Sequence, residues 1–596
     1  MSGRRSALQG LDGSHPFRQA VADGWVEYPA RKRRNGRVFL FNFALAREMG
    51  VLPADAPDVL DRKLKAEILE AFSLQIVNEY DVEHEPKAMA GTGSRRFMAT
   101  RYLQLQHPDR RGKSSGDGRS IWNGMLRCGR ESWDVSSCGT GATRLSPATA
   151  IHKRFFRTGD PSVSYGCGRA SLWDSLCAAL MSESLHAGGV RTERTLAIIE
   201  YGDGSCVGVR AYPNLLRPAH FFLWLKQGDH RRLQAAVDYY IARECDAGRF
   251  PRIADRRRRY LHLLDRVADT FAQTAARFES DYIFCWLDWD GDNILLDGGI
   301  IDYGSVRQFG LFHHEYRYDD VDRMSTTIVE QRRKARYIVQ TMAQLTDFLI
   351  EGRKRPIGAF RASAATKSFD RGFERWRAHF LVERVGFSSA LAPALLADRV
   401  FAEELREFAR HYRHFERSKA SIGPYRVSDG VTWDAVFCMR DLLRELPARL
   451  RDGAGEVAPE EFIDMMRSSY ASERDVRLYP ARRSRARRFQ RSYSRLVDRA
   501  AAIAGCGFDA MLRAVASRSA QLNPYDRITG DGVLIAARRL LSGYKDMNHK
   551  EMYAVFRGFV DAQCARPARP AALGSETSRR LHGAMLQAIR SHREGL

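Results

Sequence analysis

The pattern of apolar and polar positions divides the chain into a strand-rich first part and a helical second part. Between about residues 98 and 213, short apolar runs alternate with glycine-rich turns, which predicts β-strands. One helix is expected in this part, over about Ser171–Ala187, because leucines recur every four residues and a Gly-Gly pair follows. The runs Leu196–Ile199 and Cys206–Tyr212 flank a Gly-Asp-Gly-Ser turn, which predicts a β-hairpin.

Helical periodicity dominates from Pro218 onwards. The expected helices cover about Asp229–Cys245, Tyr260–Phe278 and Ala335–Ile350, and the strongly charged tail beyond residue 450 is also helical in pattern. We therefore predict an α+β fold in which a small β-rich lobe precedes a larger helical lobe. Together with the Asp-Asn…Asp-Tyr-Gly hairpin expected early in the second lobe, this is a protein kinase-like bilobal layout. The expected divisions are an N-terminal extension (1–90), the small lobe (91–217), the large lobe (218–450) and a helical C-terminal region (451–596).

A short hairpin is predicted near the start of the helical part. Ile294–Leu296 and Ile300–Ile301 flank an Asp-Gly-Gly turn, so the hairpin brings Asn293 and Asp302 together at its open end. Kinase folds hold Mg²⁺ against nucleotide phosphates with an Asn and an Asp in this arrangement. The alternative is a surface hairpin whose polar residues only form turns. The complete pattern, which ends in Asp302-Tyr303-Gly304, favours the nucleotide–metal site.

Composition narrows the class of protein. A chain of 596 residues with 44% hydrophobic and 10% aromatic residues is typical of a globular protein with several structural units. No apolar run reaches the roughly 18 residues of a membrane-spanning helix, so no membrane partner is expected. The N-terminus lacks the apolar core of a secretory signal, and the ten cysteines include no C-x-x-C pair. These features indicate a reducing, cytoplasmic location, which we take to be bacterial.

The net charge of +23 has two interpretations. A polyanionic partner such as RNA is one, and a solvated basic surface is the other. The basic clusters are spread along the chain with few aromatic residues between them, which favours the solvated surface. These clusters are Arg31–Arg34, Arg256–Arg259, Arg332–Arg336 and Arg482–Arg491.

Two glycine-rich segments precede the predicted helix of the first part. Glycines allow the backbone N–H groups to approach phosphate oxygens closely, although ordinary hairpin turns have the same composition. The candidate nucleotide-binding residues in these segments are Gly116, Asp117, Gly118, Arg119, Gly139 and Gly141.

Two arginines follow the second predicted hairpin. Arg210 points away from the apolar face that Val207, Val209 and Ala211 form, and Arg217 lies seven residues further on. Two guanidinium groups can clamp a phosphate through bidentate hydrogen bonds. Taken by themselves, the two residues are more typical of ordinary surface arginines or of arginines in salt bridges than of a phosphate clamp.

Taken in order, these segments resemble the selenoprotein O family of kinase-fold pseudokinases, which transfer AMP from ATP to protein hydroxyl groups. The matching segments are Leu40–Gly50, Gly116–Ser120, Trp133-Asp134 with Gly139-Thr140-Gly141, Ser182-Glu183 with His186-Ala187, Val209–Arg217 and Asp292–Gly304.

The resemblance implies a role for each site residue. Asn293 and Asp302 would hold Mg²⁺, with Mn²⁺ as an alternative, and Asp292 would be the acid that assists the incoming hydroxyl or the metal. Arg210 and Arg217 would bind phosphate oxygens of an ATP that lies reversed relative to its orientation in kinases. The α-phosphate would then face a Ser, Thr or Tyr of a protein acceptor, so that AMP is transferred and pyrophosphate leaves.

Two departures from the family pattern concern its ion pair. The family has a Lys where this chain has Cys138, and an ungapped match places Ala178 at the position of its partner Glu. In kinase folds this pair orients the phosphates. Lys113, Lys153 or Arg154 could supply the missing cation.

Asp288 adds an alternative reaction. It precedes Asn293 by the spacing that separates base and metal ligand in protein kinases, so it could accept a hydroxyl proton. The plainer interpretation is a solvent-facing acid in an acid-rich loop. Besides AMP transfer, the sequence therefore leaves open a phosphotransferase that uses Asp288 as its base. The changes at Cys138 and Ala178 leave open a nucleotide-binding pseudoenzyme.

Overall fold

The fold is described from a computed structural model. The structure describes residues 7–163, 166–285, 287, 289–304, 306–314, 316–317, 325–420, 425–426, 432–452, 455–469, 471–524, 532–563 and 573–593.

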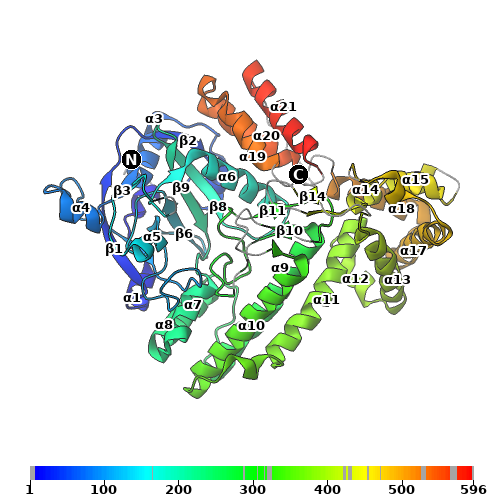
Figure 1. Ribbon diagram of the computed structural model, residues 1–596, viewed down its shortest axis with the longest axis horizontal. Coiled ribbons are helices and arrows are strands. Elements are labelled where there is room, and N and C mark those ends of the chain that lie inside the picture. The colour runs from blue at the N-terminus through cyan, green and yellow to red at the C-terminus, as the bar shows by residue number, and fades with distance from the viewer. Residues whose placement is uncertain are drawn as a thin grey trace.

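The small lobe is built on a nine-stranded antiparallel sheet (Figure 1). The strand order is β2-β8-β9-β6-β5-β4-β1-β3, and β7 pairs with β9. The strands are β1 (Trp25–Lys32), β2 (Arg37–Phe41), β3 (Leu74–Ile76), β4 (Arg96–Thr100), β5 (Ser120–Cys128), β6 (Glu131–Cys138), β7 (Ala170–Ser171), β8 (Arg194–Glu200) and β9 (Ser205–Tyr212). The predicted hairpin is confirmed as β8 and β9.

The structure differs from the expected N-terminal extension. Strands β1, β2 and β3 all precede residue 90 and belong to the same sheet as the later strands. The apolar run Val38–Phe41 in β2 is almost completely buried, because β2 pairs with β8 and covers the lobe's core. Short helices precede and connect the strands of this lobe: α1 (Pro16–Ala20), α2 (Phe43–Glu48), α3 (Arg62–Phe72), α4 (Glu79–His84) and α5 (Pro147–His152).

The predicted helix of the small lobe is confirmed as α6 (Leu172–Ala187). The Ser171 side chain caps its N-terminus by accepting a hydrogen bond from the Asp174 N–H, and Gly188 ends it. Its leucines at 172, 176 and 180 are buried against the sheet.

Long helices make up the large lobe (Figure 1). They are α7 (Pro218–Gln227), α8 (His230–Asp246), α9 (Arg256–Asp281), α10 (Ile328–Glu351) and α11 (Ala364–Val385). Helices α9 and α10 begin earlier than the apolar pattern predicts, because the side chains of Asp255 and Thr327 cap them several residues ahead of that pattern. The kinase-like α+β architecture is thus confirmed.

The C-terminal part divides into two groups of helices. The first group packs around a second apolar core to which the end of α11 also contributes. It comprises α12 (Ala392–Ala397), α13 (Arg399–Glu416), α14 (Met439–Asp452), α15 (Pro459–Asp464), α16 (Glu473–Val476), α17 (Pro480–Ala504) and α18 (Phe508–Leu522). The second group is α19 (Gly532–Leu541), α20 (His549–Ala562) and α21 (Glu576–Ser591).

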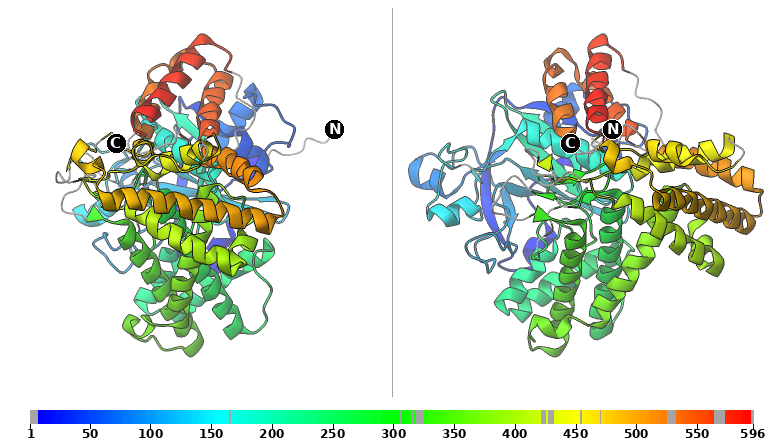
Figure 2. Two further views of the ribbon diagram at one scale, coloured as in Figure 1. Left: turned by 90° about the vertical axis from the view of Figure 1, so that its right-hand side faces the viewer. Right: turned by 45° about the vertical axis from the view of Figure 1, so that its right-hand side comes forward.

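The second group returns to the small lobe (Figure 2). The Trp173 indole N–H donates to the Leu534 carbonyl at 3.2 Å, and the Ala44 N–H donates to the Tyr553 hydroxyl at 3.1 Å. The region expected as one C-terminal unit therefore contributes to both cores.

Short pairs of strands and three 3₁₀ turns complete the description. The pairs are β10 (Ile283–Phe284) with β11 (Arg307–Gln308), β12 (Tyr316–Arg317) with β13 (Ser325–Thr326), and β14 (Tyr425–Arg426) with β15 (Thr432–Trp433). The 3₁₀ turns cover Ala7–Gly10, Ile357–Phe360 and Tyr544–Asp546.

Within the described ranges, no single helix has both the length and the apolar character needed to cross a membrane. Helices α17 and α18, which are bent by 110° relative to each other, pass that test only as a pair.

Candidate nucleotide and metal site

The predicted hairpin after β10 is present as a tight loop. Ile294 and Ile300 form an antiparallel bridge, and the Leu295 N–H donates to the Gly299 carbonyl at 2.7 Å. Gly298 has a φ of 76°, and a Cβ at this position would collide with a threonine of α9. A glycine at position 298 is therefore required by both the backbone conformation and the close approach of α9.

Asn293 and Asp302 flank the open end of this hairpin, as predicted. The Ile301 N–H donates to the Asn293 carbonyl at 3.4 Å, which places the two residues on adjacent arms. Asp302 has a φ of 72°, a left-handed conformation that is uncommon for a residue with a side chain. Its carboxylate is exposed and accepts a hydrogen bond from the Gly304 N–H at 3.3 Å. Backbone strain at an exposed acid is typical of a functional position.

Glu193 links Asp302 to the first predicted arginine. The segment before β8 pairs with the second arm of the hairpin, since the Glu193 N–H donates to the Ile300 carbonyl at 2.9 Å. Glu193 Oε1 then accepts from the Asp302 N–H at 3.0 Å, and Oε2 lies 3.1 Å from Nη1 of Arg210. No local sequence pattern points to Glu193, because only the pairing of these distant segments places it beside Asp302 and Arg210.

Arg210 on β9 is held as a cation beside the hairpin. Burial alone would lower the pKa of its guanidinium, but the negative charges of Glu193 and Asp117 outweigh burial and raise it above the ordinary value. The Nε of Arg210 is buried without a hydrogen-bond partner among the described residues. The group is thus charged at any pH of interest and retains an unused donor.

Arg217, the second predicted arginine, contacts the start of the other arm of the hairpin. Its Nη1 donates to the Asp292 carbonyl at 2.6 Å, and its guanidinium lies 4.5 Å above the ring of Tyr102. Nη2 lies 4.0 Å from Asp117 Oδ1. The structure therefore brings the two predicted arginines to opposite sides of one hairpin.

A chain of hydrogen bonds fixes the backbone of Arg217. The Arg217 N–H donates to Nδ1 of His220 at 3.0 Å, and His220 Nε2 contacts the Thr100 hydroxyl at 3.0 Å. That hydroxyl donates to Asp117 at 2.6 Å. Burial, aided by the positive charge of Arg217, lowers the pKa of His220 to about 3. His220 is therefore neutral, with Nδ1 as acceptor and Nε2–H as donor.

The first glycine-rich loop is anchored through Asp117. The carboxylate is buried, and Oδ2 accepts from the N–H of Thr100 at 3.0 Å and the indole N–H of Trp122 at 3.0 Å as well as from the Thr100 hydroxyl. Gly116 has no room for a Cβ against the Thr100 carbonyl. Asp117 therefore holds the loop in place from beneath, while phosphate binding by Gly116, Gly118 and the exposed Arg119 stays a prediction.

The second glycine-rich loop lies against the first. The Gly139 N–H donates to the Arg119 carbonyl at 2.9 Å, so the two predicted loops meet. Gly139 and Gly141 both have positive φ values, 85° and 136°, and a Cβ on either would collide with Cys206 or Ile76. The fold itself requires these glycines, and their contact with phosphate stays a prediction.

The acidic segment before the hairpin ties the lobes together. Asp292 Oδ2 accepts from the Gln104 side chain at 3.4 Å, and Asp290 Oδ2 accepts from the Leu105 N–H at 2.5 Å. The other predicted acid, Asp288, lies outside the described residues.

Lys334 on α10 is a buried cation that the sequence interpretation missed. Gln331, one turn earlier, accepts from the Cys285 N–H at 2.6 Å, so this face of α10 packs on the segment before the hairpin. Burial and the charges of Asp302 and Asp292 raise the pKa of the Cys285 thiol to about 12, whereas the charge of Lys334 opposes this shift. The charge of Lys334 therefore acts on the same thiol, that of Cys285, as the charges of Asp292 and Asp302.

The buried position of Lys334 corrects part of the prediction that the basic clusters form a solvated surface. The cluster Arg332–Arg336 was expected to be solvated, but Lys334 in its centre is only 7% exposed. The reason is helical geometry: Lys334 shares the buried face of α10 with Gln331 and Ile338, whereas Arg333 points to solvent.

The other candidate cations are exposed. Lys113, Lys153 and Arg154 all lie at the surface, and Arg154 has its own carboxylate partner, Asp160, at 3.8 Å. Cys138 ends β6, and Ala178 is half-buried in α6. The substitution of the family's ion pair at these positions stays a prediction.

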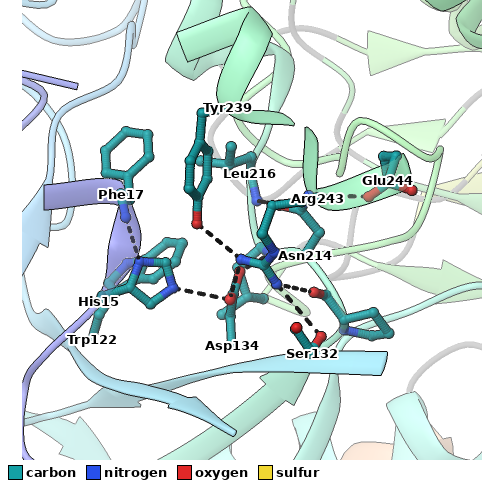
Figure 3. A network of polar contacts seen from close by, with 12 residues as sticks. His15, Phe17, Trp122, Ser132, Asp134, Asn214, Leu216, Tyr239, Arg243 and Glu244 are labelled. Atoms are coloured by element: carbon teal, nitrogen blue, oxygen red, sulfur yellow. Dashed lines mark hydrogen bonds and ion pairs between the residues drawn. The ribbon is translucent and has the colours of Figure 1, made fainter. Parts of the chain in front are cut away.

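A buried network around Asp134 supports the segment that carries Arg217 (Figure 3). Oδ1 of Asp134 accepts from His15 Nε2 at 3.0 Å and from Arg243 Nη1 at 2.7 Å, and Oδ2 accepts from the Leu215 N–H at 2.9 Å. Arg243 overcomes burial, so the pKa of Asp134 is below its usual value. One carboxylate thus joins the N-terminal segment, β6, α8 and the approach to Arg217.

In the described parts of the chain, no group of three or more His, Cys, Asp and Glu side chains is arranged to hold a metal. The candidate metal site consists of one amide and one carboxylate, Asn293 and Asp302. Oxygen ligands of this kind suit Mg²⁺, which commonly completes its octahedral shell with water and substrate phosphates.

The fold and this site define a kinase-like protein in which two arginines flank a polar hairpin. The chain belongs to the SelO family, whose model, described as protein adenylyltransferase SelO, matches residues 49–416.

Curated relatives agree with this assignment. The chain is similar to three proteins named protein nucleotidyltransferase YdiU. That of Halalkalibacterium halodurans is 29% identical over 217 residues, which are 35% of this chain and 39% of the relative. That of Rhizobium rhizogenes is 29% identical over 306 residues, 48% of this chain and 50% of the relative. That of Methylorubrum extorquens strain PA1 is 28% identical over 482 residues, 76% of this chain and 84% of the relative. The matched stretches thus span half or less of the first two relatives and most of the third.

Proposed function

We propose that the protein is a Mg²⁺-dependent nucleotidyltransferase that moves AMP from ATP to a hydroxyl side chain of a protein and releases pyrophosphate. The observation that carries this proposal is the pair of arginines bound to the two arms of the hairpin. Arg210 reaches Asp302 through Glu193, and Arg217 holds the Asp292 carbonyl. The names of the family and of the relatives support nucleotidyl transfer as the reaction.

The residues at the open end fit a divalent metal. The Asp302 carboxylate is exposed, and its single hydrogen bond within the described structure comes from the neighbouring Gly304 N–H. Asn293 is only half-buried and offers its amide oxygen. Mg²⁺ bound by these oxygens would neutralise phosphate charge during transfer. Mn²⁺ is the alternative ion for the same oxygen ligands.

The arginines would bind the phosphates of ATP. Their pairing with Glu193 and with a backbone carbonyl fixes both guanidinium groups before any ligand arrives, which favours electrostatic stabilisation of a phosphoryl group. Lys334 would add a third positive charge from α10, on the side of Cys285, and would partly compensate for the uncharged Cys138.

Asp292 would orient the acceptor hydroxyl. One of its carboxylate oxygens is held by Gln104, and its backbone carbonyl is held by Arg217. Two fixed points define the direction of this acid, as general acid–base chemistry requires. The hydroxyl proton would pass to Asp292 as the new bond to the α-phosphorus forms and the bond to pyrophosphate breaks.

The test uses the full-length protein, Mg²⁺ and ATP labelled at either the α- or the γ-phosphate, with a bacterial lysate as source of acceptors. Label transferred from the α-position, with an AMP mass increment in intact-protein spectra, is the expected result. Transfer of the γ-label would replace the proposal with a phosphotransferase, for which Asp288 is the candidate base. ATP binding without transfer of either label would indicate a nucleotide-binding pseudoenzyme.

A further inference from the structure

A separate cavity lies between α11 of the large lobe and α13 of the first C-terminal group of helices, closed at one side by the end of α9. Its volume of about 400 Å³ falls within the range of small-molecule sites, roughly 300–1,000 Å³. The hairpin and the arginines at 210 and 217 do not line it. The cavity is therefore distinct from the proposed nucleotide site.

The walls of this cavity combine an apolar surface with an excess of positive charge. Leu381 on α11 and Leu405 and Ala409 on α13 provide much of the apolar surface. Six arginines but only three glutamates line the rest. A pocket with this composition suits a ligand that has an apolar body and a negative group.

Most of these arginines have carboxylate partners. The pairs are Arg375 with Asp269, Arg377 with Glu374, Arg384 with Asp281 and Arg417 with Glu279. Two arginines differ: Nε of Arg406 and of Arg413 donates only to a carbonyl of its own helix, at 3.1 and 3.0 Å. Within the described ranges neither forms an ion pair.

Arg413 is the partly buried member of these two arginines. Burial, together with the positive charges of Arg377 and Arg417, lowers the pKa of its guanidinium. The carboxylates of Glu374 and Glu416 oppose this shift, but each already has another partner: Glu374 pairs with Arg377, and Glu416 accepts from the Tyr282 hydroxyl at 2.7 Å. A bound anion would relieve this repulsion.

We propose that the cavity binds a free small molecule that is an amphipathic anion. A phosphate or carboxylate group would contact Arg413, flanked by Arg377 and Arg417, and an apolar chain would lie against Leu381 and Leu405. This site goes beyond the proposed AMP transfer, and it does not depend on that reaction.

Calorimetry with the full-length protein and decyl phosphate tests the proposal, with inorganic phosphate and decanol as the separate halves of the probe. Decyl phosphate should bind at least about tenfold more tightly than either half. Arg413→Gln should weaken its binding about tenfold or more, the value of a charge-assisted hydrogen bond. Arg410→Gln is the matched control, since Arg410 is exposed on the same helix and does not line the cavity.

A second variant keeps all the arginines and fills the cavity. Ala409→Phe should abolish binding of decyl phosphate, and it tests the site even if Arg413→Gln does not fold. Equal binding of decyl phosphate and decanol, equal effects of Arg413→Gln and Arg410→Gln, or unchanged binding by Ala409→Phe would each overturn the proposal. Sedimentation with phosphatidic acid vesicles should show no binding; binding that Arg413→Gln removes would instead assign the anion to a lipid headgroup.

Discussion

Asp134 and Asp302 both lie in segments that resemble family motifs, yet their surroundings are opposite. Asp134 is completely buried, and three protein donors, from His15, Arg243 and Leu215, fill its carboxylate. Asp302 is exposed, has a left-handed backbone and accepts only a local N–H among the described contacts. An acid whose oxygens are occupied by the protein supports the fold, whereas an acid with unused oxygens can bind a ligand.

Replacing Asp302 should produce the largest change in activity. Asp302→Ala removes a candidate metal ligand, and we expect AMP transfer to fall about 1,000-fold, the loss seen when a principal electrostatic stabiliser is removed. The midpoint of thermal unfolding should change little, because the carboxylate is exposed. The measurement is the initial rate of α-label transfer at saturating ATP. Full activity in a correctly folded Asp302→Ala protein would exclude Asp302 from the site.

Replacing Asp134 should mainly reduce the stability of the fold, whereas replacing Asp302 should mainly reduce activity. Asp134→Ala leaves the Arg243 guanidinium buried without its carboxylate, which costs about 3–5 kcal/mol of stability. We expect a large decrease in the midpoint temperature of thermal unfolding, which differential scanning calorimetry measures. Glu456→Ala is the control, since the Glu456–Arg491 pair is at the surface and should contribute at most about 1 kcal/mol. Equal shifts for both variants would contradict the contrast between the two acids.

The buried His220, which supports the backbone of Arg217, makes the stability of the folded protein depend on pH. Its pKa of about 3 in the folded protein lies below the value of about 6.5 in an unfolded chain. Below pH 6.5 the unfolded state therefore takes up a proton that the folded state does not, and stability decreases as the pH falls. By pH 5 the expected loss is about 2 kcal/mol.

Urea unfolding at pH 7 and pH 5 measures this loss. His220→Gln should reduce the difference between the two pH values, whereas His84→Gln, at an exposed histidine, should leave it unchanged. An unchanged pH dependence in His220→Gln would show that other groups titrate.

The parts of the fold that the sequence predicted are those specified locally. The Asp-Gly-Gly hairpin, the capped helix α6 and the β8–β9 hairpin each follow from neighbouring residues. Their apolar periodicity and turn residues are sufficient to predict them.

The parts that could not be predicted depend on contacts between distant segments. Glu193 reaches Asp302 across 109 positions, and Asp134 binds His15 across 119. Strands β1–β3 in the main sheet and the return of α19–α21 to the small lobe are further examples. In each case the role of a residue depends on a partner that is distant in sequence, and the neighbouring residues do not identify that partner.

Replacing Lys334 tests which basic residue supplies the additional positive charge near the hairpin. Lys334→Met keeps the length and most of the apolar contact of the side chain but removes its charge. If Lys334 compensates for the uncharged Cys138, kcat/KM for ATP should fall about tenfold, equivalent to about 1.4 kcal/mol. Arg333→Met is the matched control, because Arg333 is the adjacent residue on α10 and faces solvent. Unchanged kcat/KM in Lys334→Met, with activity lost instead in Lys113→Ala or Lys153→Ala, would move the compensating charge from α10 to the glycine-rich side of the small lobe.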